Sequence, residues 1–504
     1  MRAIEILLAA AMLVALAGLF FRRDARPRAF TYLPAVGLLL VVVHLAAEGY
    51  RWQMVPLYAL AAVLFLATVK RLVKGERQSP PRTASRGRAV LRFLLVISGL
   101  SFFALAAALP ALFPVFRLPR PTGPHAVGTT RFSAVDNSRA ETFTDDPADR
   151  RELLMLCWYP ADPGDAAPAE PLWHPAGEIG KALFGRAGFL LDYLNLVDTH
   201  SRRDAPASGS QPSYPVLIFS HGYNVFPAQS TVLMEELASH GYVVCSVAHP
   251  YEAAATVYPD GRVARVSRER TRAVEAEDRA AGHLYRQYMQ TFERPADAAE
   301  GEALFRRFLE ATPVLNESLR VWAEDTRFAM DELERINRGE RPNILTGRLN
   351  AARVGLFGMS LGGAAAGQAC VDDPRCKAAL NIDGLQRGRL LDEPPAVPFM
   401  FVSSEFYFES GRGVNAPVYD RVRNQAYEIM VRGSGHLNFT DFYLVSPLLQ
   451  WAGAVGPADG PRVQQLLNAY TLAFFDKHLE GEPAPLLDGP PPDYPEVRFR
   501  SRRP

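Results

Sequence analysis

Long apolar runs separated by short polar connections occupy the first 116 residues. The runs are about Ile4–Phe21, Phe30–Ala47, Met54–Val69 and Ala89–Phe116. About twenty apolar residues cross a bilayer as a helix, so the third run is short and the fourth is long for this purpose. A cleaved signal peptide would explain the first run, but three further runs behind it favour a membrane region of four helices over residues 1–116.

Positive charge is distributed unevenly among the connections of this region. Two connections are basic, and the one between them carries only Glu48 and Arg51. The basic residues are Arg22, Arg23, Arg26 and Arg28 in the first connection, and Lys70, Arg71, Lys74, Arg77, Arg82, Arg86 and Arg88 in the third. Because positive loops stay cytoplasmic, we expect a multi-pass membrane protein whose residues after Phe116 face the periplasmic or extracellular side. No charged residue lies deep inside a run, which favours an anchor over a transporter.

A different pattern follows a Pro/Gly-rich link at residues 117–130. From residue 131 to residue 482, short and nearly continuous apolar runs alternate with helical segments. The runs predict strands at residues 153–160, 216–219, 243–247, 353–357, 377–382, 399–402 and 427–431. Apolar strands alternating with helices indicate an α/β fold with a largely parallel sheet covered on both faces. The Pro-rich residues 483–504 are expected to form an irregular tail.

Residues 264–340 interrupt this alternation with charged, helical sequence. A stripe on one helical face is interpreted as core packing; it consists of Leu315, Leu319, Trp322, Ala329, Leu333 and Ile336. The earlier and more polar part is expected to cover the mouth of a site as a cap. Its apolar residues either line an entrance or pack on the sheet, and the sequence favours neither; they include Leu284, Tyr285, Tyr288, Met289 and Phe292.

Net charge and composition limit the classes of function that the protein could have. A net charge of +1 over 504 residues implies no strong attraction to nucleic acid. The ten histidines lack the His-Glu-x-x-His and Cys-x-x-Cys spacings of metal sites, so neither a metal nor another cofactor is expected. Four cysteines are too few for a disulfide scaffold. Cys370 and Cys376 flank a turn-like stretch, and in an outward-facing domain they form either a disulfide or two free thiols.

The sequence Gly358-Met359-Ser360-Leu361-Gly362 follows an apolar run and precedes a run of small residues. That arrangement predicts a strand, a sharp turn and a helix, with Ser360 in the turn. Small residues two before and two after the serine are needed because the turn is tight, and Gly358 and Gly362 meet that need. The serine oxygen would then stand at the end of the strand as a nucleophile, and an ordinary Gly-rich turn is the alternative.

A serine hydroxyl needs a base, and the base needs an acid that orients it. His436 follows the last predicted strand, and the order serine, acid, histidine is that of one large class of hydrolases. Asp383 and Glu405 both end strands between the serine and the histidine, and their positions alone do not decide which is the acid. Catalytic groups of parallel sheets gather at the carboxyl ends of the strands.

Two backbone N–H groups would stabilise the oxyanion that forms during attack. One is that of Leu361, directly after the serine, and the other should come from the loop after strand 216–219. In that loop Gly222 permits a tight turn and Tyr223 supplies the N–H. His221 is interpreted as a residue that braces the loop, and His249 as a supporting or structural residue.

Seven sequence blocks between about residues 125 and 480 resemble the plasma-type platelet-activating factor acetylhydrolases, an α/β-hydrolase family. The blocks are Leu154–Pro160, Pro215–Gly222, Leu237–Pro250, Val354–Gly363, Ala379–Gly384, Val402–Phe406 and Arg432–Phe442. The resemblance implies a triad of Ser360, Asp383 and His436, oxyanion donors at Tyr223 and Leu361, and calcium-independent release of short or oxidised acyl chains from phospholipids. It leaves Glu405 as a supporting residue. The chain departs from the family in having Met359 before the serine, and in having the loop Gly222-Tyr223-Asn224-Val225 where the family has Gly-Leu-Gly.

The sequence therefore predicts a membrane-anchored serine esterase whose substrate is a lipid or other small ester. Two alternatives stay open. The same triad serves polyester, thioester or peptide hydrolysis, and a silent, membrane-tethered binding protein would share the fold.

Overall fold

The computed structural model describes residues 1–19, 29–73, 86–162, 164, 167–291, 298–405, 408–409, 412–489 and 492–503. Two compact units make up the chain. One is residues 1–116 with the short segments 192–197 and 445–448, and the other is residues 117–191, 198–444 and 449–504.

Apolar helices form the N-terminal unit. They are α1 (Ala3–Ala17), α2 (Ala29–Ala47), α3 (Val55–Val73, preceded by the 3-10 turn Trp52–Met54) and α4 (Arg86–Leu112). Among the residues that the structure describes, three segments are long and apolar enough to cross a membrane: Ala29–Ala47, Trp52–Val73 and Phe93–Leu112. Helix α1 has 15 residues and is shorter than a typical span, so the expected count of four stays a prediction. Most of the basic residues used for the orientation lie outside the described residues.

This unit buries apolar side chains between its helices and exposes others. Leu8, Met12, Leu57 and Ala61 pack together, and a side chain at Gly37 would collide with Met12. Large apolar side chains such as Leu39, Leu66 and Leu95 are exposed on the outer surface, as on helices surrounded by lipid. A buried polar cluster also holds the unit together, because Arg51 donates to Glu5 (3.1 Å) and to the Phe113 carbonyl at the end of α4 (2.8 Å).

A single mixed sheet organises the second unit. Its strand order is β15-β14-β11-β10-β9-β5-β6-β2-β1-β4-β3. The strands are β1 (Ala126–Ala140), β2 (Arg150–Ala161), β3 (Ala169–Pro171), β4 (Asp198–Arg203), β5 (Tyr214–Ser220), β6 (Val243–Val247), β9 (Leu349–Met359), β10 (Cys376–Ile382), β11 (Phe399–Ser404), β14 (Ala426–Val431) and β15 (Val497–Arg502). The six neighbours from β14 to β6 pair in parallel, while β2 and β15 join them antiparallel.

Both faces of the parallel strands are buried, which explains their continuous apolar sequences. Along β5, Val216 and Ile218 pack on one face and Leu217 and Phe219 on the other. Helices α9 (Pro313–Asn337) and α10 (Leu361–Asp372) cover the first face, and α6 (Thr231–Ser239) and α14 (Gly460–Phe475) cover the second. Because these neighbouring strands run parallel, the carboxyl ends of β5, β9, β10 and β14 lie at one edge of the sheet.

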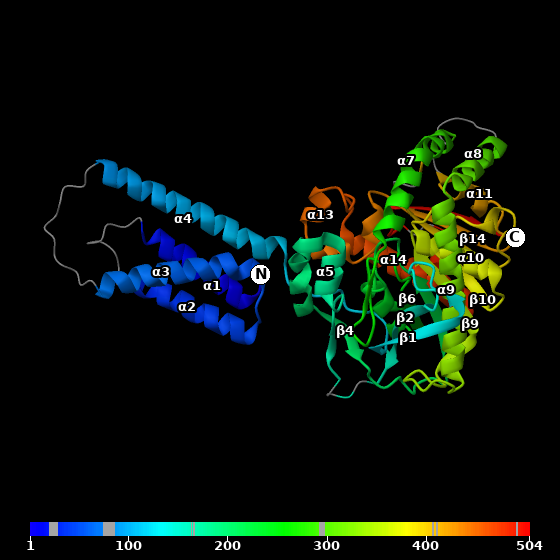
Figure 1. The fold of residues 1–504 in the computed structure, drawn as a ribbon, viewed down its shortest axis with the longest axis horizontal. Helices are drawn as coiled ribbons and strands as arrows, with labels where there is room; N and C mark the ends of the chain where they lie inside the picture. Colours follow the sequence, from blue (N-terminus) through cyan, green and yellow to red (C-terminus); the bar gives the residue numbers. More distant parts are fainter. Residues whose placement is uncertain are drawn as a thin grey trace. The chain divides into compact units, whose positions relative to one another are not determined.

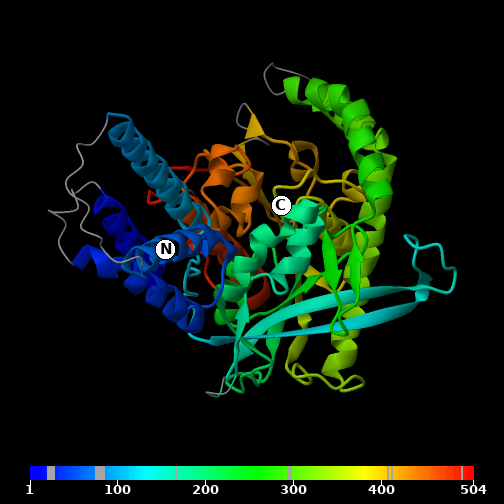
Figure 2. The same ribbon diagram turned by 60° about the vertical axis from the view of Figure 1, so that its left-hand side comes forward.

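The sequence missed several strands at the sheet's borders. The link at 117–130 is not wholly irregular, because β1 begins at Ala126 and pairs with β2 as a long ribbon, drawn in cyan in Figure 2. The expectation of an irregular tail at 483–504 is wrong for its last part. Val497–Arg502 forms β15, which pairs with β14 and closes that end of the sheet.

The described part of the insertion at 264–340 contains three helices: α7 (Arg268–Gln290), α8 (Ala298–Glu310) and α9. Helices α7 and α8 lie side by side and extend beyond the sheet (Figures 1 and 2). The stripe from Leu315 to Ile336 is buried, which confirms core packing for α9, and its first residue, Leu315, also borders the cavity at Ser360. Leu284, Tyr288 and Met289 are buried in the same core, so these three pack rather than line an entrance. Phe292 lies outside the described residues.

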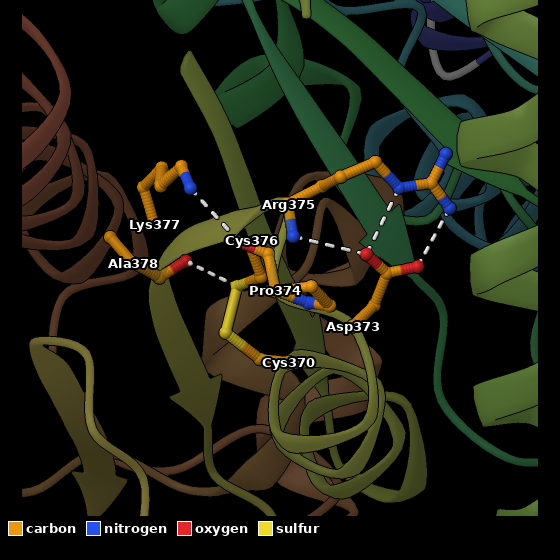
Figure 3. The surroundings of a disulfide bond; sticks show 7 residues. All are labelled: Cys370, Asp373, Pro374, Arg375, Cys376, Lys377 and Ala378. Carbon is orange, nitrogen blue, oxygen red and sulfur yellow. Dashed lines mark hydrogen bonds and ion pairs between the residues drawn. A yellow bond between two sulfur atoms is a disulfide. The ribbon is translucent and has the colours of Figure 1, made fainter. Parts of the chain in front are cut away.

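Two disulfides involve all four cysteines. Cys370, at the end of α10, is bonded to Cys376, at the start of β10, with a Cα–Cα distance of 5.1 Å. Figure 3 shows the turn that they close, in which Arg375 pairs with Asp373. The sequence left this bond and free thiols open as alternatives. It gave no indication of the second bond, Cys157–Cys245, which joins directly opposed residues of β2 and β6.

Candidate active site

Ser360 occupies a sharp turn between β9 and α10. Its φ and ψ are 57° and −126°, outside the regions that side chains prefer. Side chains at the flanking glycines would not fit, because a Cβ at Gly358 would lie 2.4 Å from the backbone of Gly362, and one at Gly362 would lie 2.1 Å from the Ser220 oxygen. The Ser360 N–H donates to the Ile382 oxygen at 2.8 Å and fixes the turn against β10. The strained serine is thus held where β9 ends.

His436 and Asp383 come from loops after β14 and β10. The Nδ1 atom of His436 lies 2.7 Å from Oδ2 of Asp383, so this nitrogen carries the proton donated to the carboxylate. Asp383 is buried, and its Oδ1 accepts the Ser404 N–H at 2.5 Å. The imidazole is about one-third exposed, at 35% of its side chain. An anchored carboxylate therefore orients a ring that still reaches solvent.

Glu405, the competing carboxylate, lies beside the same loop and binds different atoms. Its Oε2 accepts the Gly433 N–H at 2.8 Å, and its own N–H donates to the Ser434 oxygen at 3.3 Å. It thus braces the backbone that leads to His436, whereas Asp383 contacts the imidazole itself.

The loop after β5 runs alongside the serine. A Cβ built on Gly222 would lie 3.6 Å from the Ser360 Cβ. Among the hydrogen bonds of the described residues, none uses the Tyr223 N–H. Leu361 is the first residue of α10, where N–H groups have no helical acceptor. The N–H groups of Tyr223 and Leu361 therefore have no hydrogen-bond acceptor among the described residues and belong to the two segments next to Ser360, and Asn224 continues the loop with a positive φ of 54°.

His221 is buried under this loop and is held by hydrogen bonds at both ring nitrogens. Nδ1 lies 2.7 Å from the Gly222 oxygen and therefore donates, and Nε2 accepts the His249 N–H at 3.1 Å. Burial, with the neighbouring His249 second, lowers the pKa of His221 to about 3. The ring is neutral, and both of its nitrogens already form hydrogen bonds. This arrangement suits a residue that braces the loop and not a catalytic base.

Trp322 of α9, together with His249 and Glu252, forms a buried platform that contacts the loop after β5. The His249 ring stacks on Trp322 with centroids 4.0 Å apart, and Trp322 donates to Glu252 at 2.7 Å. Glu252 in turn accepts the Asn224 N–H through its backbone oxygen at 2.9 Å. The sequence placed Trp322 in a packing stripe and gave no signal for its polar role, because the partners lie far away along the chain.

Asp325 joins this platform to the sheet. It accepts from His249 Nδ1 at 2.9 Å and from two nitrogens of Arg151, on β2, at 2.7 and 3.1 Å. All three side chains are buried. Burial alone would raise the pKa of Asp325, but the Arg151 charge and the His249 hydrogen bond outweigh it and hold the pKa well below its usual range.

A cavity of about 340 Å³ opens at Ser360. Its wall is mostly apolar and aromatic, with contributions from the insertion helices and the loops: Tyr223, Val274, Tyr285, Phe308, Leu315 and Leu385. Tyr285 is therefore the one described residue of the expected entrance set that lines it. Two charged residues, Asp278 and Arg387, also face the cavity, and burial raises the pKa of Asp278 while the Arg387 charge opposes that rise.

One group in the described part of the chain has metal-ligand spacing, and it lies in the N-terminal unit. Glu5, His44 and Glu48 place ligand atoms within 4.8 Å of one another. Both carboxylates already face arginines, Glu5 facing Arg51 at 3.1 Å and Glu48 facing Arg2 at 3.4 Å. Arginine charge therefore already faces both carboxylates.

Comparisons with known proteins identify relatives of the second unit. The profile of a family described as platelet-activating factor acetylhydrolase, isoform II, matches residues 111–483. A platelet-activating factor acetylhydrolase of Cavia porcellus is 26% identical over 381 residues, which cover 72% of this chain and 78% of the relative. A probable 1-alkyl-2-acetylglycerophosphocholine esterase of Arthroderma benhamiae is 22% identical, covering 80% and 98%. The solved structure of a ferulic acid esterase from Streptomyces cinnamoneus is similar with a TM-score of 0.58 and 26% identity, covering 77% of this chain and 99% of that one.

Proposed function

The chain belongs to the platelet-activating factor acetylhydrolase, isoform II, family and is a carboxylic ester hydrolase with an α/β-hydrolase fold, and on that premise we propose that it cleaves short-acyl lipid esters with Ser360, His436 and Asp383. The observation that carries the triad is the 2.7 Å contact between His436 Nδ1 and Asp383 Oδ2. Two features support it: the strained turn at Ser360 and the two free N–H groups beside that residue.

In the proposed mechanism, the Ser360 oxygen attacks the ester carbonyl and His436 Nε2 takes the serine proton. Asp383 keeps the Nδ1 proton in place and stabilises the imidazolium. The oxyanion accepts from the Tyr223 and Leu361 N–H groups, each such donor being worth about 2.7–4 kcal/mol in a transition state. Collapse of the intermediate transfers the histidine proton to the leaving alcohol. Water, deprotonated by His436, then releases the acid from the serine.

The size and the lining of the cavity favour a substrate with a short acyl group. Its volume of about 340 Å³ lies at the small end of the range of ligand pockets, about 300–1,000 Å³. Its apolar lining suits a hydrocarbon group beside Ser360. One relative is named an acetylhydrolase, and another is named a probable esterase of 1-alkyl-2-acetylglycerophosphocholine, which also favours a small acyl group on a lipid.

We further propose that the helices of the N-terminal unit anchor the enzyme in a membrane, with the hydrolase unit outside the cytoplasm. Three helices of sufficient length and apolarity support anchoring. The unequal basic connections support the orientation. Two disulfides in the hydrolase unit suit an oxidising compartment.

A panel of p-nitrophenyl esters and short-acyl phosphatidylcholines, assayed with the purified full chain in detergent and with chelator present, tests this proposal. We expect kcat/KM to fall as the acyl chain lengthens beyond a few carbons, and chelator to have no effect. Turnover of peptides or thioesters without turnover of oxygen esters would contradict the proposed chemistry, and a preference for long chains would contradict the short-acyl assignment.

A further inference from the structure

Gln229 lies between three loops that carry the proposed catalytic groups, and its side chain is fully buried. Its Oε1 accepts the Gly222 N–H at 2.8 Å, and its Nε2 lies 2.8 Å from Sδ of Met359, the residue before Ser360. Its backbone oxygen accepts the Asp441 N–H at 2.9 Å, in the segment that follows His436. One residue therefore touches the oxyanion loop, the serine turn and the histidine segment.

The orientation of the amide is determined by its partners. A backbone N–H can only donate, so the atom facing Gly222 is the amide oxygen, and the NH₂ group must face Met359. Thioether sulfur is a weak acceptor, which makes this pairing unusual for a buried amide. The methionine that distinguishes this serine motif from that of the family is thus the residue against which Gln229 packs.

The Tyr223 N–H must point at the oxyanion. The backbone preferences of Gly222, the residue before it, do not fix that direction, so hydrogen bonds must do so. Gly222 has wide freedom in φ and ψ, so two rigid peptide planes meet at a flexible hinge. The plane that contains Tyr223 N–H is held through the Gly222 oxygen, which accepts from His221 Nδ1 at 2.7 Å and from the Val225 N–H at 3.2 Å. The preceding plane is held through the Gly222 N–H, and Gln229 is the group that holds it.

The position of Gln229 is itself secured. Asp441, which donates to its backbone, accepts the Thr231 and Val232 N–H groups at 2.6 and 3.3 Å at the start of α6. The residue that accepts the Gly222 N–H is therefore attached, through Asp441, to the start of α6. Without it, the Gly222 N–H would be a buried, unsatisfied donor beside Ser360.

We propose that Gln229 is a positioning residue for the oxyanion hole, acting through the Gly222 N–H and seated against Met359. The proposal rests on the proposed function, since it presumes that Tyr223 N–H stabilises an oxyanion. It assigns Gln229 no contact with substrate. Its effect belongs to the transition state, so it should influence kcat and leave KM nearly unchanged.

Gln229→Met tests the proposal, because methionine keeps the length of the side chain and replaces the accepting amide oxygen with a weakly accepting thioether. We expect kcat for p-nitrophenyl acetate to fall about 10–100-fold, less than the loss of a whole oxyanion donor, with KM within about two-fold. Gln368→Met is the matched control. Gln368 is also buried and makes two hydrogen bonds, to Asp372 and from the Arg389 N–H, at the far end of α10. An unchanged kcat, or a loss no larger than that of the control, would overturn the proposal.

Gln229→Glu provides a second readout that does not depend on the first variant folding. The protonated carboxyl keeps an acceptor for Gly222 and a donor for Met359, whereas the ionised form places negative charge beside the oxyanion. We expect the kcat profile of this variant to fall with rising pH, in a limb absent from the wild type. A profile identical to the wild type would overturn the proposal.

Failure of the inference is distinguishable from failure of the proposed function. If the wild type neither hydrolyses esters nor reacts with a fluorophosphonate, the function is wrong. If the wild type does both and the Gln229 variants match it, only the positioning role is wrong.

Discussion

Replacing Asp325 by asparagine should destabilise the hydrolase unit without altering the shape of its core. Asp325 is fully buried and receives hydrogen bonds from Arg151 and His249. Asparagine is nearly isosteric but uncharged, so Arg151 would keep only its pair with Glu141, at 3.0 Å. Breaking a buried ion pair by removing one partner costs about 3–5 kcal/mol, because the remaining charge stays desolvated.

That free energy corresponds to a measurable shift in melting temperature. A unit of roughly 380 residues unfolds with an entropy of about 0.8 kcal/mol/K, from about 2.1 cal/mol/K per residue. A loss of about 3–5 kcal/mol therefore lowers Tm by about 4–6 °C. The shift should be measured by calorimetry or fluorescence on the purified full chain in detergent, with Asp331→Asn, at a more exposed position of the same helix, as control.

The pH dependence of this loss of stability follows from the direction in which the pKa of Asp325 is shifted. Because the folded-state pKa of Asp325 is held well below its usual range, its contribution is present above the unfolded pKa of about 3.9. It is lost only as pH falls below that value towards the folded pKa. The difference in Tm between wild type and variant should therefore be constant from about pH 5 to pH 8. A variant as stable as the wild type would refute the view that this charge holds the platform to the sheet.

Three further predictions concern the disulfides, the acid and the topology. Cys157→Ser with Cys245→Ser opens a loop of 88 residues and should cost about 4–5 kcal/mol in a chain-entropy estimate; a denaturation midpoint equal to that of the wild type would contradict the bond. Asp383→Asn should lower kcat by about 10⁴-fold, as in a serine protease, and Glu405→Gln much less, and the reverse ranking in steady-state assays would reassign the acid. A C-terminal phosphatase fusion should be active, whereas a fluorescent fusion that matures only in the cytoplasm should be dark; the opposite pattern would invert the orientation.

The elements that the sequence predicted are those whose residues carry their own signal. Buried parallel strands such as β5 and β6 are continuously apolar, and the glycines around Ser360 are required by the turn itself. The missed strands lack that signal. Strand β1 contains both polar and apolar residues, and its pairing with β2 depends on the tertiary structure. Strand β15 is rich in arginine, and only Val497 and Phe499 in it are apolar.

Contacts between residues distant in sequence were also beyond prediction. The Cys157–Cys245 bond requires the register of β2 and β6, which no local pattern specifies. Trp322 could be placed on a buried stripe by its helical spacing, but its stacking on His249 depends on how α9 crosses the sheet. Gln229 likewise shows its role only when Gly222 and Met359 are brought together.

The central claim, that Ser360 is the nucleophile, is tested most directly by covalent labelling. The purified chain should be incubated with a fluorophosphonate, digested and sequenced by mass spectrometry, alongside Ser360→Ala. We expect a single adduct on Ser360, loss of ester hydrolysis in step with labelling, and neither labelling nor hydrolysis in the variant. An adduct at another residue, or hydrolysis that survives in Ser360→Ala, would contradict the account.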